Sequence, residues 1–172
     1  MPTSPLPFDP VAEARQHWRD RWSTGEHMAA ATSLMRAHQI VLAAVEEQLA
    51  PFGLTFSSYE ALMLLSFSRR GSLPLGKMSA RLMVHPASVT NTIDRLERSG
   101  LVRRRRDERD GRRVLAEITP EGRRLAEQAT VPLNRSAFGL AMLDDDQVAL
   151  VNALLRRVRS GDLDERVPDA WA

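Results

Sequence analysis

Apolar side chains recur every three or four residues along most of this 172-residue chain, which predicts a mainly helical protein. Over 26–50 the spacing is kept through three heptads, and Pro51 and Gly53 follow where such a helix should stop. A shorter amphipathic helix is predicted over 11–22. The first ten residues hold four prolines, so we expect residues 1–10 to be disordered.

Three more helices are predicted in the middle and at the end of the chain. Ser57 and Glu60 have the spacing of a capping box, so a largely buried helix should begin at Ser57. Thr119 is placed to cap a later helix, which Pro132 should kink or break. A second capping-box pattern, which begins at Asp144, opens the last amphipathic helix.

The segment 75–118 begins with two further helices. A short helix precedes Pro86, whose missing N–H suits the first position of the next helix. In that second helix the apolar positions are Val89, Ile93 and Leu96, and a glycine follows its end. Two short helices joined by a tight turn predict a helix-turn-helix.

An arginine-rich hairpin follows these two helices. The run Leu101–Arg106 contains four consecutive arginines, Asp110-Gly111 is a strong turn signal, and Val114–Ile118 supplies the returning strand. Leu73 can pair with this hairpin as a short third strand. The predicted fold class is therefore mainly α with a small β-hairpin wing: a winged helix-turn-helix flanked by N- and C-terminal helices.

Charge is distributed unevenly along the chain. The whole sequence has 24 basic and 22 acidic residues, a formal net charge of +2, and the high pI of about 9.9 overstates this small excess. Arg69–Arg113 contains 13 of the basic residues but only 5 of the acidic ones. A basic segment with acidic flanks is typical of a nucleic-acid-binding face carried on a neutralising scaffold.

Composition excludes several other classes of protein. The chain has no cysteine, which excludes disulfides, thiolate metal sites and thiol-based redox sensing. The wholly apolar runs, such as Ile40–Val45 and Ala61–Leu65, are short, so no transmembrane helix is predicted. The N-terminus lacks the pattern of a signal peptide, and we expect a cytoplasmic protein.

Enzyme motifs are missing or incomplete. The four histidines have no H-E-x-x-H spacing, and no G-x-S-x-G occurs. Gly71–Lys77 reads G-x-x-x-x-G-K, but Met78 stands where a phosphate-binding loop needs Ser or Thr, and a helix rather than a strand precedes it. We therefore predict no enzyme, no metal and no cofactor.

The run Ser88–Leu125 resembles the winged helix of the MarR family of bacterial transcription regulators. The similarity includes the wing, Asp107–Arg112, and the strand-to-helix junction Ile118–Gly122; with the flanking helices it covers 28–160. The resemblance implies a dimer in which terminal helices interleave and two wings point at DNA.

The second helix of the predicted winged helix has a polar face that can enter a major groove. Its candidate DNA-binding residues are Ser88, Thr90, Asn91, Arg95 and Arg98. Arg95 is long enough for a bidentate contact to guanine, and Asn91 can pair with adenine.

The turn of the hairpin supplies a second group of DNA-binding candidates. Arg109, Arg112 and Arg113 lie at or beside the turn, where a hairpin tip can reach a minor groove. Arg112 matches the wing arginine of the family and is the expected inserted residue, with Arg109 as the alternative. Asp107 and Asp110 are expected to brace an arginine by ion pairing; an acidic loop that is merely solvated is the other interpretation.

Five side chains are candidates for the wall of an effector pocket. They are Trp18, Trp22, His27, His38 and Tyr59. The tryptophans can instead pack against the body of the protein, and His38 can be a packed histidine with one partner. Some similar regulators with an extra N-terminal helix bind urate through a Trp and an Asp, but no Asp occurs here between Asp20 and Asp94, so that ligand is not carried over.

Five parts are predicted along the chain. They are a disordered N-terminus (1–10), N-terminal helices for dimerisation with a candidate ligand pocket (11–52), the winged helix-turn-helix DNA-binding lobe (53–119), C-terminal dimerisation helices (120–160) and a tail (161–172). The flanking helices are not needed to fold a winged helix, so their apolar faces predict a homodimer.

The predicted function is a ligand-responsive dimeric transcription regulator, most simply a repressor, that binds a palindromic double-stranded DNA operator. A small-molecule effector is expected because no thiol is present to sense oxidation. The alternative is a winged helix that acts as a protein–protein interaction module without DNA binding. The polar face around Asn91 favours DNA over an apolar docking strip.

Overall fold

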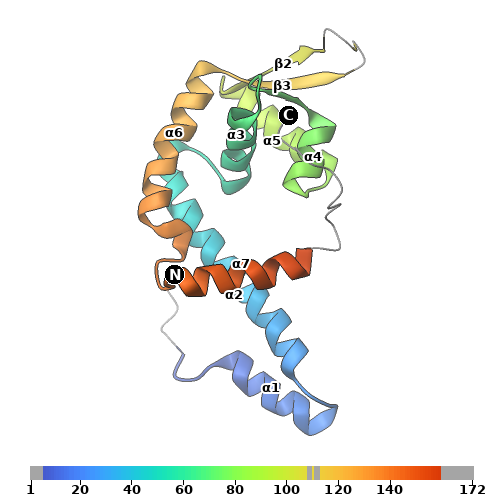
Figure 1. Cartoon of the computed structure of the whole chain (residues 1–172), viewed down its shortest axis with the longest axis vertical. Helices are drawn as coiled ribbons and strands as arrows, with labels where there is room; N and C mark the ends of the chain where they lie inside the picture. Colours follow the sequence, from blue (N-terminus) through green and yellow to red (C-terminus); the bar gives the residue numbers. More distant parts are fainter. Residues whose placement is uncertain (1–5, 108–109, 111–112, 160–172) are drawn as a thin grey trace. The chain divides into compact units, whose positions relative to one another are not determined.

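The computed structural model describes residues 6–107, 110 and 113–159. The chain divides into two compact units, one up to Ala43 and one from Ala44 onward. In chain order the described elements (Figure 1) are α1 (Pro10–Arg21), α2 (Glu26–Leu49), the 3-10 turn η1 (Ala50–Phe52), α3 (Phe56–Phe67), β1 (Ser72–Pro74), α4 (Leu75–Leu82), α5 (Pro86–Arg98), β2 (Val102–Arg106), β3 (Val114–Ile118), α6 (Pro120–Arg135), the 3-10 turn η2 (Ala137–Gly139) and α7 (Asp145–Arg159).

The first unit contains α1 and most of α2. The carboxylate of Asp9 caps α1 by accepting from the backbone N–H of Val11 at 2.9 Å. The turn to α2 passes so close to α1 that a Cβ on Gly25 would lie 2.7 Å from the carbonyl oxygen of Arg15. Only glycine fits there without a shift of the backbone, which explains why a glycine closes the first amphipathic segment.

The segment Glu26–Phe52 is long and apolar enough, by length and composition, to cross a membrane. The sequence prediction of no such helix was too strict, because it counted only wholly apolar runs and this segment is interrupted by polar residues such as Arg36 and His38. Core helices of soluble proteins pass the same test, so this property does not assign the chain to a membrane.

The second unit contains the predicted winged helix-turn-helix. Helices α3, α4 and α5 pack around a three-stranded antiparallel sheet of order β1-β3-β2, and α6 runs alongside α3 (Figure 1). The centre of this lobe is apolar. Its most buried large side chains, each at most 2% exposed, are Leu49, Leu62, Leu65, Met78, Ile93, Leu96, Val102 and Leu133. The apolar positions predicted for α5 are thus in the core, and the fold prediction is confirmed.

The register of the sheet decides which arginines of β2 share a face. Arg103 lies opposite Glu117, and Arg104 lies opposite Ala116. Alternation along a strand therefore places Arg103 and Arg105 on one face of the hairpin and Arg104 on the other. β1 pairs with β3, Leu73 opposite Ala116, which confirms the predicted third strand.

Two details of the helix boundaries differ from the sequence prediction. Thr55, not Ser57, is the N-cap of α3, and its hydroxyl accepts from the backbone N–H of Ser58 at 3.4 Å. The predicted capping box of Ser57 with Glu60 was wrong because both residues lie inside the helix. Helix α6 also continues through Pro132 and ends three residues later, at Arg135, so Pro132 does not break the helix where the sequence suggested.

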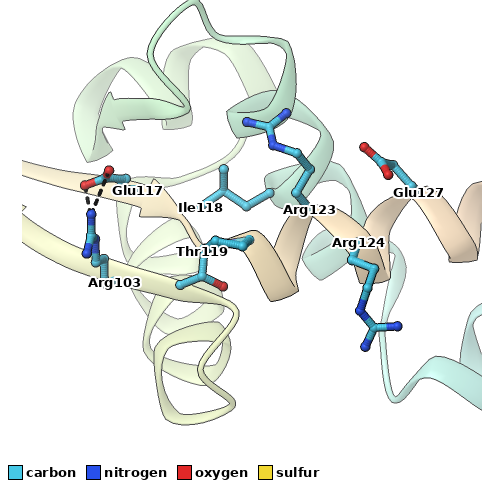
Figure 2. Close-up of a pocket in the computed structure, with 8 residues that line it drawn as sticks. Arg103, Glu117, Ile118, Thr119, Arg123, Arg124 and Glu127 are labelled. Carbon is cyan, nitrogen blue, oxygen red and sulfur yellow. Dashed lines mark hydrogen bonds and ion pairs between the residues drawn. The ribbon is translucent and has the colours of Figure 1, made fainter.

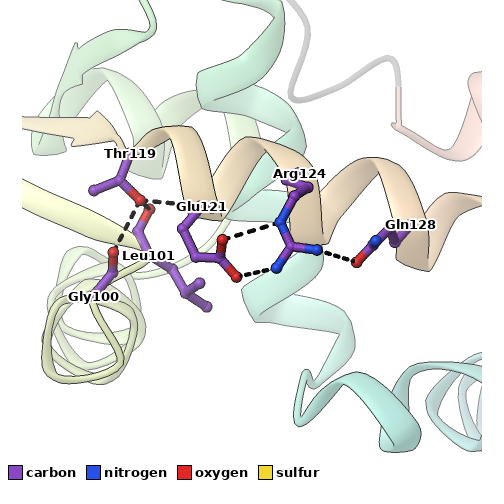
Figure 3. A network of polar contacts seen from close by, with 7 residues as sticks. Gly100, Leu101, Thr119, Glu121, Arg124 and Gln128 are labelled. Carbon is purple, nitrogen blue, oxygen red and sulfur yellow. Dashed lines mark hydrogen bonds and ion pairs between the residues drawn. The ribbon is translucent and has the colours of Figure 1, made fainter.

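The junction between β3 and α6 is held by Thr119 (Figure 3). Its hydroxyl donates to the carbonyl oxygens of Gly100 and Leu101, at 2.9 and 3.1 Å, and accepts from the backbone N–H of Gly122 at 3.0 Å. Thr119 is therefore the N-cap that the sequence predicted, and it also joins α6 to the start of β2.

Replacing Gly122 with alanine should destabilise this lobe by about 1–3 kcal/mol. A Cβ at this position would lie 2.1 Å from the carbonyl oxygen of Leu101, so α6 or β2 would have to shift. Gly76→Ala in α4 is the matched control, because a Cβ there meets nothing within 4 Å. Urea unfolding of both variants checks this: equal stability of Gly122→Ala and the wild type would contradict the close approach.

The capping box predicted for the last helix is confirmed. The backbone N–H of Asp144 donates to Gln147 Oε1 at 3.1 Å, and the N–H of Gln147 donates to Asp144 Oδ1 at 2.8 Å. Along α7 the side chains of Leu150, Leu154 and Val158 are 60%, 53% and 69% exposed. They form a stripe of one residue every four positions, an apolar face on the outside of the single chain.

Candidate nucleic-acid interface

Helix α5 has an outward face and two flanks that contact other elements. His85 caps the helix, Pro86 occupies its first position as predicted, and Val89, Ile93 and Leu96 are buried. The five candidates for base contact on this helix are all exposed: Ser88, Thr90, Asn91, Arg95 and Arg98. At 100° per residue, Asn91 and Arg98 lie most nearly opposite the buried positions.

Arg95 lies on the flank of α5 that faces the start of α3. Its Nη2 donates to Thr55 Oγ1 and to Ser58 Oγ, both at 2.6 Å. The sequence reasoning treated Arg95 as a side chain available for guanine, because partners 37 and 40 residues earlier leave no local signal. A contact between Arg95 and a base remains a prediction, and it requires Arg95 to use its other N–H groups or to leave these hydroxyls.

The opposite flank of α5 contacts β2 through Arg104. Its Nη2 lies 2.5 Å from Asp94 Oδ1, and its Nη1 donates to Glu97 Oε2 at 2.5 Å. The backbone N–H of Arg104 donates to the other oxygen of Glu97 at 2.9 Å. These two hydrogen bonds, the backbone one first, hold the pKa of Glu97 below its usual value, so this carboxylate is ionised at neutral pH.

The other face of the hairpin carries a second ion-pair group (Figure 2). Arg103 donates from Nε and Nη2 to the two carboxylate oxygens of Glu117, at 3.3 and 3.0 Å, and Arg105 Nε lies 2.9 Å from Glu117 Oε2. The hydrogen bonds from Arg103 are the main reason that the pKa of Glu117 is lowered. The arginine run is thus not a bare basic patch, because Arg103, Arg104 and Arg105 each form an ion pair with a residue that the structure describes.

The tip of the wing is only partly described. Arg109 and Arg112, the candidates for minor-groove insertion, lie outside the described residues, as does the glycine of the predicted turn. Arg113 Nε forms an ion pair with Asp110 Oδ2 at 3.1 Å. The backbone N–H of Arg113 donates to the carbonyl oxygen of Asp110, and the N–H of Asp107 donates to the carbonyl oxygen of Arg113. Among the described residues, an Asp does pair with an arginine here, Asp110 with Arg113, and a bracing role of Asp107 and Asp110 toward DNA remains a prediction.

A groove of about 480 Å³ lies between the start of α4 and the wing. It is lined by Pro74, Leu75, Gly76, Lys77, Arg113 and Val114. Lys77, the single lysine of the chain, and Arg113 thus flank one groove although they are far apart in sequence. In the sequence Lys77 stands in an incomplete phosphate-loop motif, and no local pattern there indicates DNA binding.

The ligand-pocket candidates fall into both units. The rings of Trp18 and Trp22 contact each other with centroids 4.5 Å apart and planes tilted by 50°, and His27 and His38 are exposed. Tyr59, in the second unit, is 5% exposed and its hydroxyl is 2.9 Å from Thr130 Oγ1. Tyr59 is therefore a core residue with a satisfied hydroxyl, whereas His38 is exposed in the single chain, and its packing in a dimer stays a prediction.

Comparison with known proteins identifies the family of this chain. The sequence profile of the MarR family matches residues 54–114. The HTH-type transcriptional regulator YhbI of Bacillus subtilis is 34% identical over 111 residues, which cover 64% of this chain and 71% of YhbI.

Solved structures agree with this placement. Sco5413, a MarR family transcriptional regulator from Streptomyces coelicolor, is 51% identical, with a TM-score of 0.75 over 81% of this chain and 99% of its own. CouR from Rhodococcus jostii RHA1, whose structure contains p-coumaroyl-CoA, is 28% identical, with a TM-score of 0.68 over 81% of this chain and 95% of CouR. The chain described here belongs to the MarR family of transcriptional regulators.

Proposed function

We propose that this regulator binds a palindromic operator as a homodimer, with α5 of each copy in a major groove and each wing at the adjacent minor groove. The observation that carries the proposal is the exposed polar face of α5, centred on Asn91 and Arg98. The apolar face on the opposite side of the same helix is buried in the core. Repression is the simplest outcome, because a dimer seated on a promoter excludes other proteins.

The membership in a family of transcription regulators argues against an enzyme. Among the residues that the structure describes, no group of three or more His, Asp or Glu side chains could hold a metal ion. We place the protein in the cytoplasm, where its DNA is, and the membrane-length segment Glu26–Phe52 is better used as a dimerisation helix.

A gel shift with the DNA upstream of the chain's own gene, beside a large excess of nonspecific competitor, tests this function. A DNA-binding regulator should retain a discrete shifted band under competition. The protein–protein alternative predicts no shift beyond that of any basic protein, and complete loss of the band with competitor on every fragment tried would support that alternative.

We expect Lys77→Gln to lower the affinity for every DNA sequence by a similar factor. Lys77 flanks the groove between α4 and the wing and lies outside α5, so we expect its ammonium to meet a phosphate and not a base edge. The slope of log affinity against log salt should fall by about one unit. Arg135→Gln, which removes the same charge from the end of α6, is the control; a change of preference at one base in Lys77→Gln would contradict a phosphate contact.

A small-molecule effector is part of the proposal. CouR, with p-coumaroyl-CoA bound, is a precedent for ligand binding among similar structures. The absence of cysteine leaves thiol oxidation without a residue to act on. An effector can release DNA only if it binds one arrangement of the dimer better than the other, since equal affinity for both shifts nothing.

A further inference from the structure

Arg104 differs from Arg103 and Arg105 in the direction of its side chain. It shares its face of the hairpin with Val102 and lies opposite Ala116, and both of these neighbours are buried. Its side chain is 24% exposed, compared with 68% for Arg103 on the other face. An inward-facing guanidinium of this kind needs charged partners within the protein, because a half-buried cation is otherwise costly.

The polar partners of the Arg104 side chain, among the residues that the structure describes, come from α5. The guanidinium contacts the carboxylates of Asp94 and Glu97 at 2.5 Å each, and its Nη2 lies 3.5 Å from the carbonyl oxygen of Thr90. These residues extend over two turns of the helix, from its exposed front half to its end. One side chain of the wing therefore contacts most of the length of one flank of the recognition helix.

The backbone strengthens the same contact. β2 is an edge strand, because the sheet order is β1-β3-β2, so every second N–H of β2 has no strand partner. The N–H of Arg104 is satisfied by Glu97 Oε1 at 2.9 Å. Glu97 thus holds both the backbone and the side chain of Arg104, and the group Arg104, Asp94 and Glu97 forms a bridge that we call the helix–wing clamp.

We infer that the helix–wing clamp fixes the offset between α5 and the wing, and that Arg104 thereby determines the spacing between the major-groove and minor-groove parts of each half-site. Arg104 is a positioning residue, since its guanidinium is engaged by α5. The inference rests on the proposed function, because it requires both α5 and the wing to contact DNA. It adds a specificity determinant at a residue that reads no base.

The test uses the full-length protein and its operator, with variants in which one base pair is inserted between the bases contacted by α5 and the segment contacted by the wing. Fluorescence anisotropy gives the ratio of Kd on the inserted operator to Kd on the native one. A rigid clamp predicts a ratio of about ten or more for the wild type. Arg104→Met should lower that ratio to within about threefold of one, with an unchanged salt slope.

Arg103→Met is the matched control, because it removes an arginine that pairs with Glu117 on the other face and does not contact α5. It should keep the wild-type spacing ratio. Arg104→Lys should restore part of the ratio, since an ammonium keeps the charge but lacks the planar fork whose separate nitrogens reach Asp94 and Glu97. If Arg104→Met does not fold, Asp94→Asn and Glu97→Gln test the clamp from the side of α5. Both should lower the ratio of Kd on the inserted operator to Kd on the native one.

The outcomes separate the inference from the proposed function. If the wild type binds no operator, the proposed function fails. If the wild type binds but tolerates the insertion, or if the clamp variants weaken both operators equally and keep the ratio, the clamp does not set the spacing and the inference is overturned. A fall of about one unit in the salt slope of Arg104→Met would instead make Arg104 a phosphate contact.

Discussion

Deletion of residues 144–172 should yield a monomer that has lost specific DNA binding, with affinity for the operator lower by at least about a thousandfold. The deletion removes α7, whose stripe of Leu150, Leu154 and Val158 is exposed in the single chain. An apolar stripe of this kind on an amphipathic helix is stabilised when a second copy covers it. A palindromic operator engages both lobes, so one lobe alone should retain little beyond nonspecific affinity.

Sedimentation velocity and anisotropy measure the two parts of this prediction. Leu154→Glu should dissociate the dimer without shortening the chain, while Asn152→Glu, on another side of α7, should leave it intact. A shorter deletion, of residues 160–172, keeps α7 whole and is the control for loss of chain length. A monomeric 144–172 deletion that still bound its operator with wild-type affinity would contradict the dimer.

Asn91→Ala should cost about 1–3 kcal/mol of binding free energy and relax the preference at a single base position. Asn91 is exposed at the centre of the outward face of α5, one turn after the start of the helix, where an amide can pair with the major-groove edge of adenine. Titration against operators that carry each of the four base pairs at every position of the half-site gives the result. A uniform loss on all operators would identify a phosphate contact instead.

Arg95→Ala is the informative comparison for Asn91→Ala. If the guanidinium stays on Thr55 and Ser58 when DNA is bound, its loss should lower the free energy of unfolding and leave base preference unchanged. If Arg95 leaves these hydroxyls to read guanine, as the sequence predicts, the variant should relax a second base position. The same titrations distinguish the two roles.

The helices and the sheet were predictable because their signals are local. The apolar spacing of Val89, Ile93 and Leu96 determines which side of α5 is buried, and the capping roles of Thr119 and Asp144 follow from side chains within three residues. The cap of α3 was placed two residues late, because Thr55 and Ser57 both carry a hydroxyl suitable for an N-cap.

The polar contacts of the site were less predictable because they join distant segments. In the sequence the four arginines of β2 read as one basic cluster, although strand alternation alone should have separated Arg104 from Arg103 and Arg105. The acidic spacing of Asp94 and Glu97 on one flank of α5 was the signal that could have found the clamp. No local pattern indicated that Arg95 would reach the start of α3.

The most direct test of the central claim, that two copies of this lobe read a two-fold symmetric DNA site through α5, is a missing-base interference footprint of the purified protein on its operator. The account predicts interference at two symmetric groups of bases whose centres lie about 10 base pairs apart. Asn91→Ala should remove interference at the same position of both groups. A single asymmetric footprint, or interference unchanged by Asn91→Ala, would contradict it.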